Sequence, residues 1–134
     1  MQVVFTIGNK MKIISTNDAP QAIGPYSQAL DLGEFVFLSG QIPLDPQTMQ
    51  MTGSNITEQT GQVFKNIQAV LKAAELDLSN VVKTTVFLAE MNDFVAMNAV
   101  YEQCFDGHKP ARSAVEVARL PKDSLVEIEC IAKR

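Results

Sequence analysis

Residues 81–105, VVKTTVFLAEMNDFVAMNAVYEQCF, decide the fold class of this chain, because they place a strand directly before a helix. The run Val81–Leu88 is rich in β-branched residues and too short for a typical helix, which predicts a β-strand. Asn92 then offers a helix cap, and Gly107 and Pro110 are stop signals. Between them, apolar side chains recur at helical spacing along one stripe: Phe94, Met97, Val100, Tyr101 and Cys104.

Strands are also predicted closer to the N-terminus. Residues 28–32 and 35–39 are two strand-like runs, and the short Gly33-Glu34 segment between them favours a β-hairpin. A further strand is expected at residues 12–15.

The rest of the chain completes an alternating pattern. Asn55 followed by Glu58 is typical of a helix start, and apolar residues at helical spacing extend this helix to about Glu75. Two more strands are predicted at residues 112–118 and 125–132, on either side of the turn-like RLPKDS. The predicted fold is α+β, with two helices packed on one face of a mixed sheet.

Size and charge limit the function classes. The chain has 134 residues, near the usual size of one domain, and carries a net charge of -4 with a pI near 4.9. Nucleic acids and acidic membranes attract basic surfaces, so neither partner is expected. The apolar run at residues 3–7 is too short for a signal peptide, and no apolar stretch approaches the length of a membrane span. We therefore expect a cytoplasmic protein.

Familiar catalytic and metal-binding patterns are absent from the sequence. There is one histidine and no GxSxG, P-loop or GxGxxG motif. Cys104 and Cys130 form no cluster with His108, so no metal site is expected. Cys130 is interpreted as a small core residue, Cys104 as helix packing, and His108 as a solvated loop residue.

Three polar residues lie in unusual surroundings, and the sequence pattern alone leaves their roles open. Arg112 begins a strand, where its planar fork suits a carboxylate, although spacing alone favours a surface arginine. Glu127 lies between core-facing residues and points to the other sheet face, as does Glu129. Tyr26 follows Gly24-Pro25, and a buried turn tyrosine is the simpler interpretation.

Long segments around these residues resemble one family. NDAPQAIGPYSQAL, FLSGQIPLDPQT, VVKTTVFLAEMNDFVAMNAVYEQCF and KPARSAVEVARLPKDSLVEIECIA match, in order, the RidA (YjgF/YER057c/UK114) family of reactive-intermediate deaminases. The resemblance implies a chorismate-mutase-like fold assembled as a homotrimer, with sites in the clefts between subunits. It begins near Met11, which makes residues 1–10 a candidate N-terminal extension of a single domain spanning residues 1–134.

The resemblance also assigns roles to individual residues. Arg112 matches the arginine that clamps the substrate carboxylate, and Glu127 matches the glutamate that positions or activates water. Ala114 occupies a position where many deaminating members have cysteine, so it keeps the backbone donor and loses the thiol. The remaining matches are polar or backbone groups of the cleft: the side chains of Tyr26, Ser39 and Asn98, and the backbone N–H of Gly40.

The implied activity is hydrolysis of 2-imino acids, derived from 2-aminoacrylate and 2-aminocrotonate, to 2-keto acids and ammonia. An imine is already electrophilic, so the reaction needs no cofactor or metal, only a carboxylate clamp and proton transfer. The alternative is a non-catalytic regulatory protein that binds small acids in the same clefts, which Ala114 favours. A ribonuclease, as some relatives have been described, is disfavoured by the acidic balance.

Overall fold

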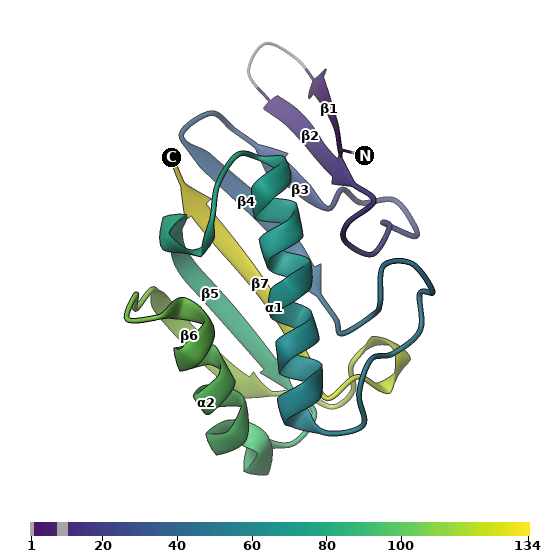
Figure 1. Cartoon of the computed structure of the whole chain (residues 1–134), viewed down its shortest axis with the longest axis vertical. Coiled ribbons are helices and arrows are strands. Elements are labelled where there is room, and N and C mark those ends of the chain that lie inside the picture. The colour runs from purple at the N-terminus through teal and green to yellow at the C-terminus, as the bar shows by residue number, and fades with distance from the viewer. Residues whose placement is uncertain (1, 8–10) are drawn as a thin grey trace.

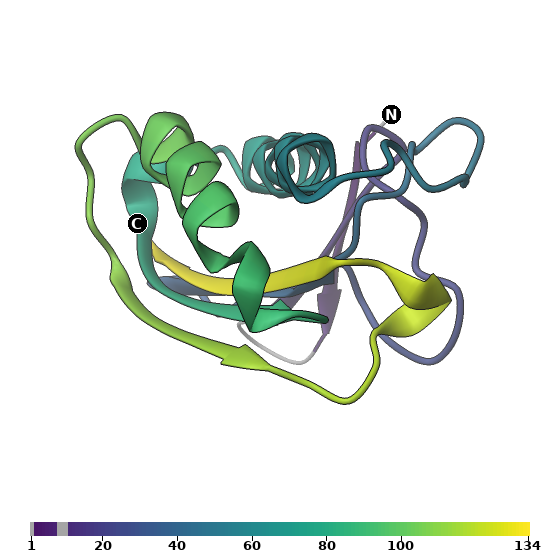
Figure 2. The same ribbon diagram turned by 90° about the horizontal axis from the view of Figure 1, so that it is seen from below.

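A computed structural model describes the backbone of residues 2–7 and 11–134 and the side chains of residues 11–134. The fold is α+β: both long helices cover one face of a seven-stranded mixed sheet (Figures 1 and 2), which confirms the predicted class. The strands are β1 (Gln2–Ile7), β2 (Met11–Thr16), β3 (Ala29–Asp31), β4 (Phe35–Gln41), β5 (Val81–Leu88), β6 (Ala111–Glu116) and β7 (Val126–Lys133), and the helices are α1 (Ile56–Ala73) and α2 (Phe94–Phe105).

The C-terminal strand lies in the middle of the sheet. The strand order is β1-β2-β3-β4-β7-β5-β6, so β7 joins the N-terminal strands to the later ones. Among the described strands, only the β5–β6 pair is parallel, and β6 forms one edge of the sheet. The other edge is β1, a strand that was not predicted, which pairs with β2 from Gln2↔Thr16 to Ile7↔Met11. Strand β2 lies where residues 12–15 predicted one.

Helix α1 begins where the sequence predicts. The Asn55 side chain accepts a hydrogen bond from the Glu58 N–H at 2.9 Å, a cap that stabilises a helix by about 1 kcal/mol. The helix ends at Ala73, two residues before the predicted end at Glu75. Its buried face includes Val63, Phe64 and Val70, each at most 1% exposed, which fixes the helix against the sheet.

Helix α2 begins differently from the prediction. Asn92 is not its cap, because Met91–Asp93 forms a short 3-10 turn and Asp93 precedes the first helical residue without a side-chain cap bond. The turn is tied to β6 instead, where the Met91 N–H donates to Glu116 Oε1 at 2.8 Å. The helix ends before Gly107, as predicted: Phe105 is its last residue, and Asp106 (φ 47°) and Gly107 (φ 91°) follow with positive φ.

The alternation of β7 separates the two faces of the sheet. Its residues Val126, Ile128, Cys130 and Ala132 are 3% exposed or less and pack beneath the helices, which confirms Cys130 as a core residue. Glu127 and Glu129 therefore lie on the open face, as predicted. Within the described part of the chain, no helix has the length and apolar character that crossing a membrane requires.

Candidate active site

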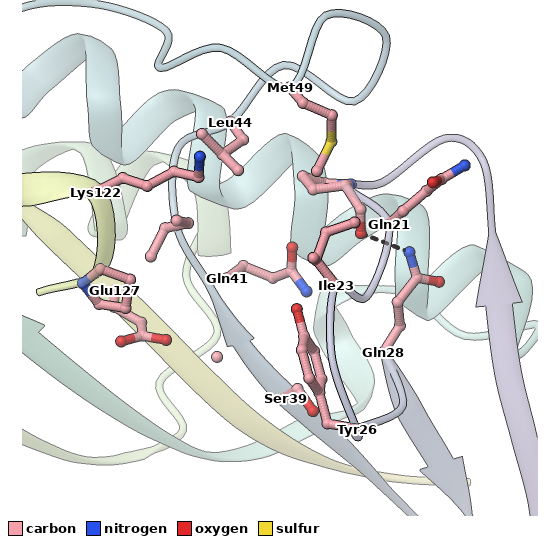
Figure 3. Close-up of a pocket in the computed structure, with 14 residues that line it drawn as sticks. Gln21, Ile23, Tyr26, Gln28, Ser39, Gln41, Leu44, Met49, Lys122 and Glu127 are labelled. Carbon is pink, nitrogen blue, oxygen red and sulfur yellow. Dashed lines mark hydrogen bonds between the residues drawn. The ribbon is translucent and has the colours of Figure 1, made fainter.

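A hollow of about 430 Å³ lies where β4 ends and β7 begins (Figure 3). Tyr26, Ser39, Gly40 and Glu127, four of the predicted site residues, line it. The β4–β7 pairing is interrupted between Leu38 and Gln41, so Ser39 and Gly40 lie in an irregular stretch of the strand. Such irregularities redirect side chains and free backbone groups from the ladder.

Glu127 approaches the backbone of β4 so closely that position 40 has no room for a side chain. A Cβ built on Gly40 would lie 2.9 Å from the Glu127 carboxyl carbon and still nearer to Oε2. The carboxyl is half-buried, and this burial, followed by the nearby Glu129 carboxylate, raises the pKa of Glu127 above its ordinary value of 4.5. A carboxylate with a raised pKa in a hollow is suited to accepting and returning a proton.

Tyr26 belongs to a loop that a buried amide holds against the sheet. The Gln28 side chain donates to Pro20 O at 2.8 Å (dashed in Figure 3) and accepts from the Thr16 N–H at 2.7 Å. Tyr26 is 53% exposed and its hydroxyl points toward the Gln41 side chain (Figure 3), so the simpler interpretation of a buried turn tyrosine is wrong. The Ser39 hydroxyl donates to Ser27 O at 2.6 Å, which leaves its oxygen free to accept.

A second hollow, of about 490 Å³, surrounds Arg112. The guanidinium donates to Asn98 Oδ1 at 2.6 Å, so two predicted site residues are in direct contact. Its central carbon lies 4.7 Å from the Tyr101 ring centroid and 5.4 Å from that of Phe94. These distances are typical of cation–π contacts, and they leave no support for Arg112 as a freely solvated surface residue.

The Arg112 and Glu127 side chains leave the sheet on opposite faces. Arg112 pairs with Thr84, which is buried beneath the helices, whereas Glu127 pairs with Phe87 on the open face. Ala114 lies on the Arg112 side, two residues along β6. Within one subunit the structure therefore brings together two groups of predicted residues but does not bring Arg112 next to Glu127.

The family model described as Endoribonuclease L-PSP matches residues 16–134. The mouse 2-iminobutanoate/2-iminopropanoate deaminase is 51% identical over 121 residues, which cover 90% of this chain and 90% of that protein. This chain belongs to the RidA family. A RutC family protein of Pyrococcus horikoshii is 54% identical over 121 residues, 90% of this chain and 96% of that one. The crystal structure of E. coli TdcF with bound serine matches with a TM-score of 0.87 and 49% identity, covering 91% of this chain and 98% of that chain.

Some contacts in this RidA family member were not predicted. His108 is not a solvated loop residue, because its Nε2 lies 2.6 Å from Val81 O and its ring packs against Phe105. Tyr101 was assigned only to an apolar helical stripe, yet its ring contacts the Arg112 guanidinium. A hydroxyl-bearing residue on an otherwise apolar stripe was the available signal. Among residues 11–134, no three His, Cys, Asp or Glu side chains are placed to hold a metal ion.

Proposed function

We propose that this protein is a 2-imino acid deaminase whose site is completed between subunits. The observation that carries the proposal is the division of the site: Glu127 and Arg112 line separate hollows, and their side chains leave the sheet on opposite faces. The name of the mouse relative, 2-iminobutanoate/2-iminopropanoate deaminase, supports the reaction class. A second subunit supplying the missing half would place Arg112 opposite Glu127.

The open face of the sheet supports assembly into a homotrimer. It carries large apolar side chains, among them Phe35, Phe37 and Val115, which are 38%, 45% and 42% exposed. Apolar groups gathered on one sheet face favour burial against another surface. In a closed ring of three subunits, this face would be covered and each Glu127 hollow would meet the β6 edge of a neighbour.

The free edge of β6 supplies backbone donors to such a cleft. The Val117 N–H donates to Leu88 O at 2.9 Å, so alternate residues of this segment bond to β5. The N–H groups of Arg112 and Ala114 therefore point away from β5, toward the unpaired edge. There the Ala114 N–H is free to donate to a substrate oxygen, a role that needs no thiol.

The chemistry then needs only these residues. Arg112 would grip the substrate carboxylate through two parallel hydrogen bonds, which orients C2 of the imine. Glu127 would take a proton from water as the water oxygen bonds to C2, and would pass this proton to the imine nitrogen. It would then move the hydroxyl proton to the same nitrogen as the C=O bond forms and the C–N bond breaks, which releases ammonia. The products are a 2-keto acid and ammonia, with no change of oxidation state.

The test is a coupled assay in which the purified protein is added to a serine or threonine dehydratase reaction. We expect faster release of the 2-keto acid, in the presence of chelator and without added metal. A variant carrying Glu127→Gln serves as the control for effects of added protein. Release no faster than spontaneous hydrolysis would favour the alternative of a non-catalytic small-acid binder, which Ala114 and the serine bound to the related TdcF support.

A further inference from the structure

The Tyr101 side chain contacts the Arg112 guanidinium through its ring and the sheet through its hydroxyl. Its ring centroid lies 4.7 Å from the guanidinium carbon, and its hydroxyl hydrogen-bonds Thr84 Oγ1 at 2.7 Å. Thr84 is 1% exposed and is the residue of β5 directly paired with Arg112. The arginine backbone and the platform under its side chain are thus both fixed by one position of the sheet.

We propose that Tyr101 is a positioning residue that sets the plane of the Arg112 guanidinium for carboxylate binding. The proposal rests on the proposed function, in which Arg112 is the carboxylate clamp. Asn98 Oδ1 accepts a hydrogen bond from one guanidinium nitrogen at 2.6 Å. The contact with the Tyr101 ring limits rotation of the guanidinium about that hydrogen bond. Together they leave the outer edge of the planar fork available to a substrate carboxylate.

The physical reason is the freedom that an arginine otherwise has. A long side chain loses conformational entropy when it is immobilised, and that loss weakens binding if it occurs only when the ligand arrives. Contact with an aromatic face fixes the guanidinium beforehand, because the cation is attracted to the ring. Tyr101 is 7% exposed, and its ring packs edge-to-face against Phe64 with the ring centroids 5.7 Å apart. This packing restricts rotation of the Tyr101 ring.

The platform also stays uncharged. Burial raises the pKa of the Tyr101 phenol above its ordinary value of 10.0, so the ring carries no negative charge at neutral pH. Tyr101 therefore acts on the clamp through its π face and not as an ion pair that would neutralise the guanidinium.

Three substitutions separate positioning from packing. Tyr101→Leu removes the ring, Tyr101→Phe keeps the ring and removes the hydroxyl, and Phe105→Leu loosens the same aromatic cluster without touching Arg112. Binding of 2-oxobutanoate is measured by calorimetry, turnover by the coupled assay, and stability by thermal unfolding. Tyr101→Leu is expected to bind about 3- to 30-fold more weakly, the range of a cation–π contact, with KM raised and kcat largely kept.

The two remaining variants are expected to bind almost as the wild type does, although both lower the unfolding temperature. Thr84→Val combined with Tyr101→Phe should recover stability relative to Tyr101→Phe alone, because no buried hydroxyl is then left unpaired. If Phe105→Leu weakens binding as much as Tyr101→Leu, Tyr101 acts by packing and the proposal is wrong.

Arg112→Ala distinguishes this proposal from the proposed function. If Arg112→Ala loses binding while Tyr101→Leu binds as the wild type does, only the positioning role is overturned. If Arg112→Ala itself binds 2-oxobutanoate normally, the carboxylate clamp is wrong and both proposals fall. Weak binding by both, with Tyr101→Phe near wild type, supports both.

Discussion

Glu127→Gln is the substitution that tests the proposed chemistry most directly. Glutamine keeps the size of the side chain and a hydrogen-bonding oxygen, and it fits the same space beside Gly40. It removes the basic carboxylate, so proton transfer to and from the reacting atoms is lost. Because Arg112 lies in the other hollow, the grip on the substrate carboxylate should remain.

The expected size of the effect follows from the environment of the carboxyl. General acid–base catalysis contributes roughly 100-fold to 10,000-fold, which corresponds to about 3 to 5 kcal/mol of activation free energy. The raised pKa of Glu127 brings the base closer to neutral pH, and this favours a large effect on kcat. KM and the affinity for a 2-keto acid should change little.

The same raised pKa predicts that Glu127→Gln lowers activity without lowering stability. Burial disfavours ionised Glu127 in the folded protein, so this group favours the folded state at acid pH and loses that contribution as the pH rises through its folded pKa. Glutamine carries no charge to bury. At neutral pH, Glu127→Gln should therefore unfold at the same or a higher temperature than the wild type, while turnover falls.

The assay measures kcat and KM across pH, with thermal unfolding on the same samples. In the wild type, the acid limb of kcat/KM should lie above the ordinary glutamate value of 4.5. Glu129→Gln is the matched control, because it makes the same charge change on the same sheet face outside the hollow. Wild-type turnover by Glu127→Gln, or equal impairment by Glu129→Gln, would refute the acid–base assignment.

Three further predictions concern the clamp, the close approach and the assembly. Arg112→Lys should weaken 2-keto acid binding because an ammonium lacks the planar fork, and Arg112→Ala should weaken the binding free energy by on the order of 2 to 5 kcal/mol. Calorimetry measures both affinities, and unchanged affinity in both variants would contradict the clamp. Gly40→Ala should displace the Glu127 side chain and lower kcat, with little change in thermal unfolding; unchanged kcat would show that the carboxyl position is not critical. Light scattering should find trimers both for the full chain and for a chain starting at Met11, although β1 pairs with β2; a monomeric full chain would remove the proposed site.

Local signals predicted most of the fold. The hairpin of β3 and β4, the start of α1 at Asn55 and the bounds of β5 all follow from short-range patterns that tertiary contacts reinforce. The predicted start of α2 was wrong because the preceding turn is fixed by a hydrogen bond from Met91 to Glu116, 25 residues further along the chain. Strand β1 was not predicted because a short apolar run has only a weak strand propensity of its own. The strand is stabilised by its pairing with β2, which the local sequence does not show.

The candidate site was only half accessible to sequence reasoning. Alternation along β7 placed Glu127 on the open face, but no local pattern indicates that Arg112 lies on the opposite one. That arrangement depends on the parallel register of β5 and β6, which only the assembled sheet defines. The contacts of Tyr101 with Arg112 and Thr84 likewise join three separate elements, so they leave no trace at a fixed spacing.

The separation of Arg112 and Glu127 has a genetic consequence. In the proposed ring, each cleft takes its arginine from one chain and its glutamate from the next, so two defective alleles can complement each other. When Arg112→Ala and Glu127→Gln chains mix at random, about a quarter of the clefts pair an intact arginine with an intact glutamate. Cells that express both alleles would thus regain about a quarter of normal activity from two inactive proteins, whereas a site contained within one chain would regain none.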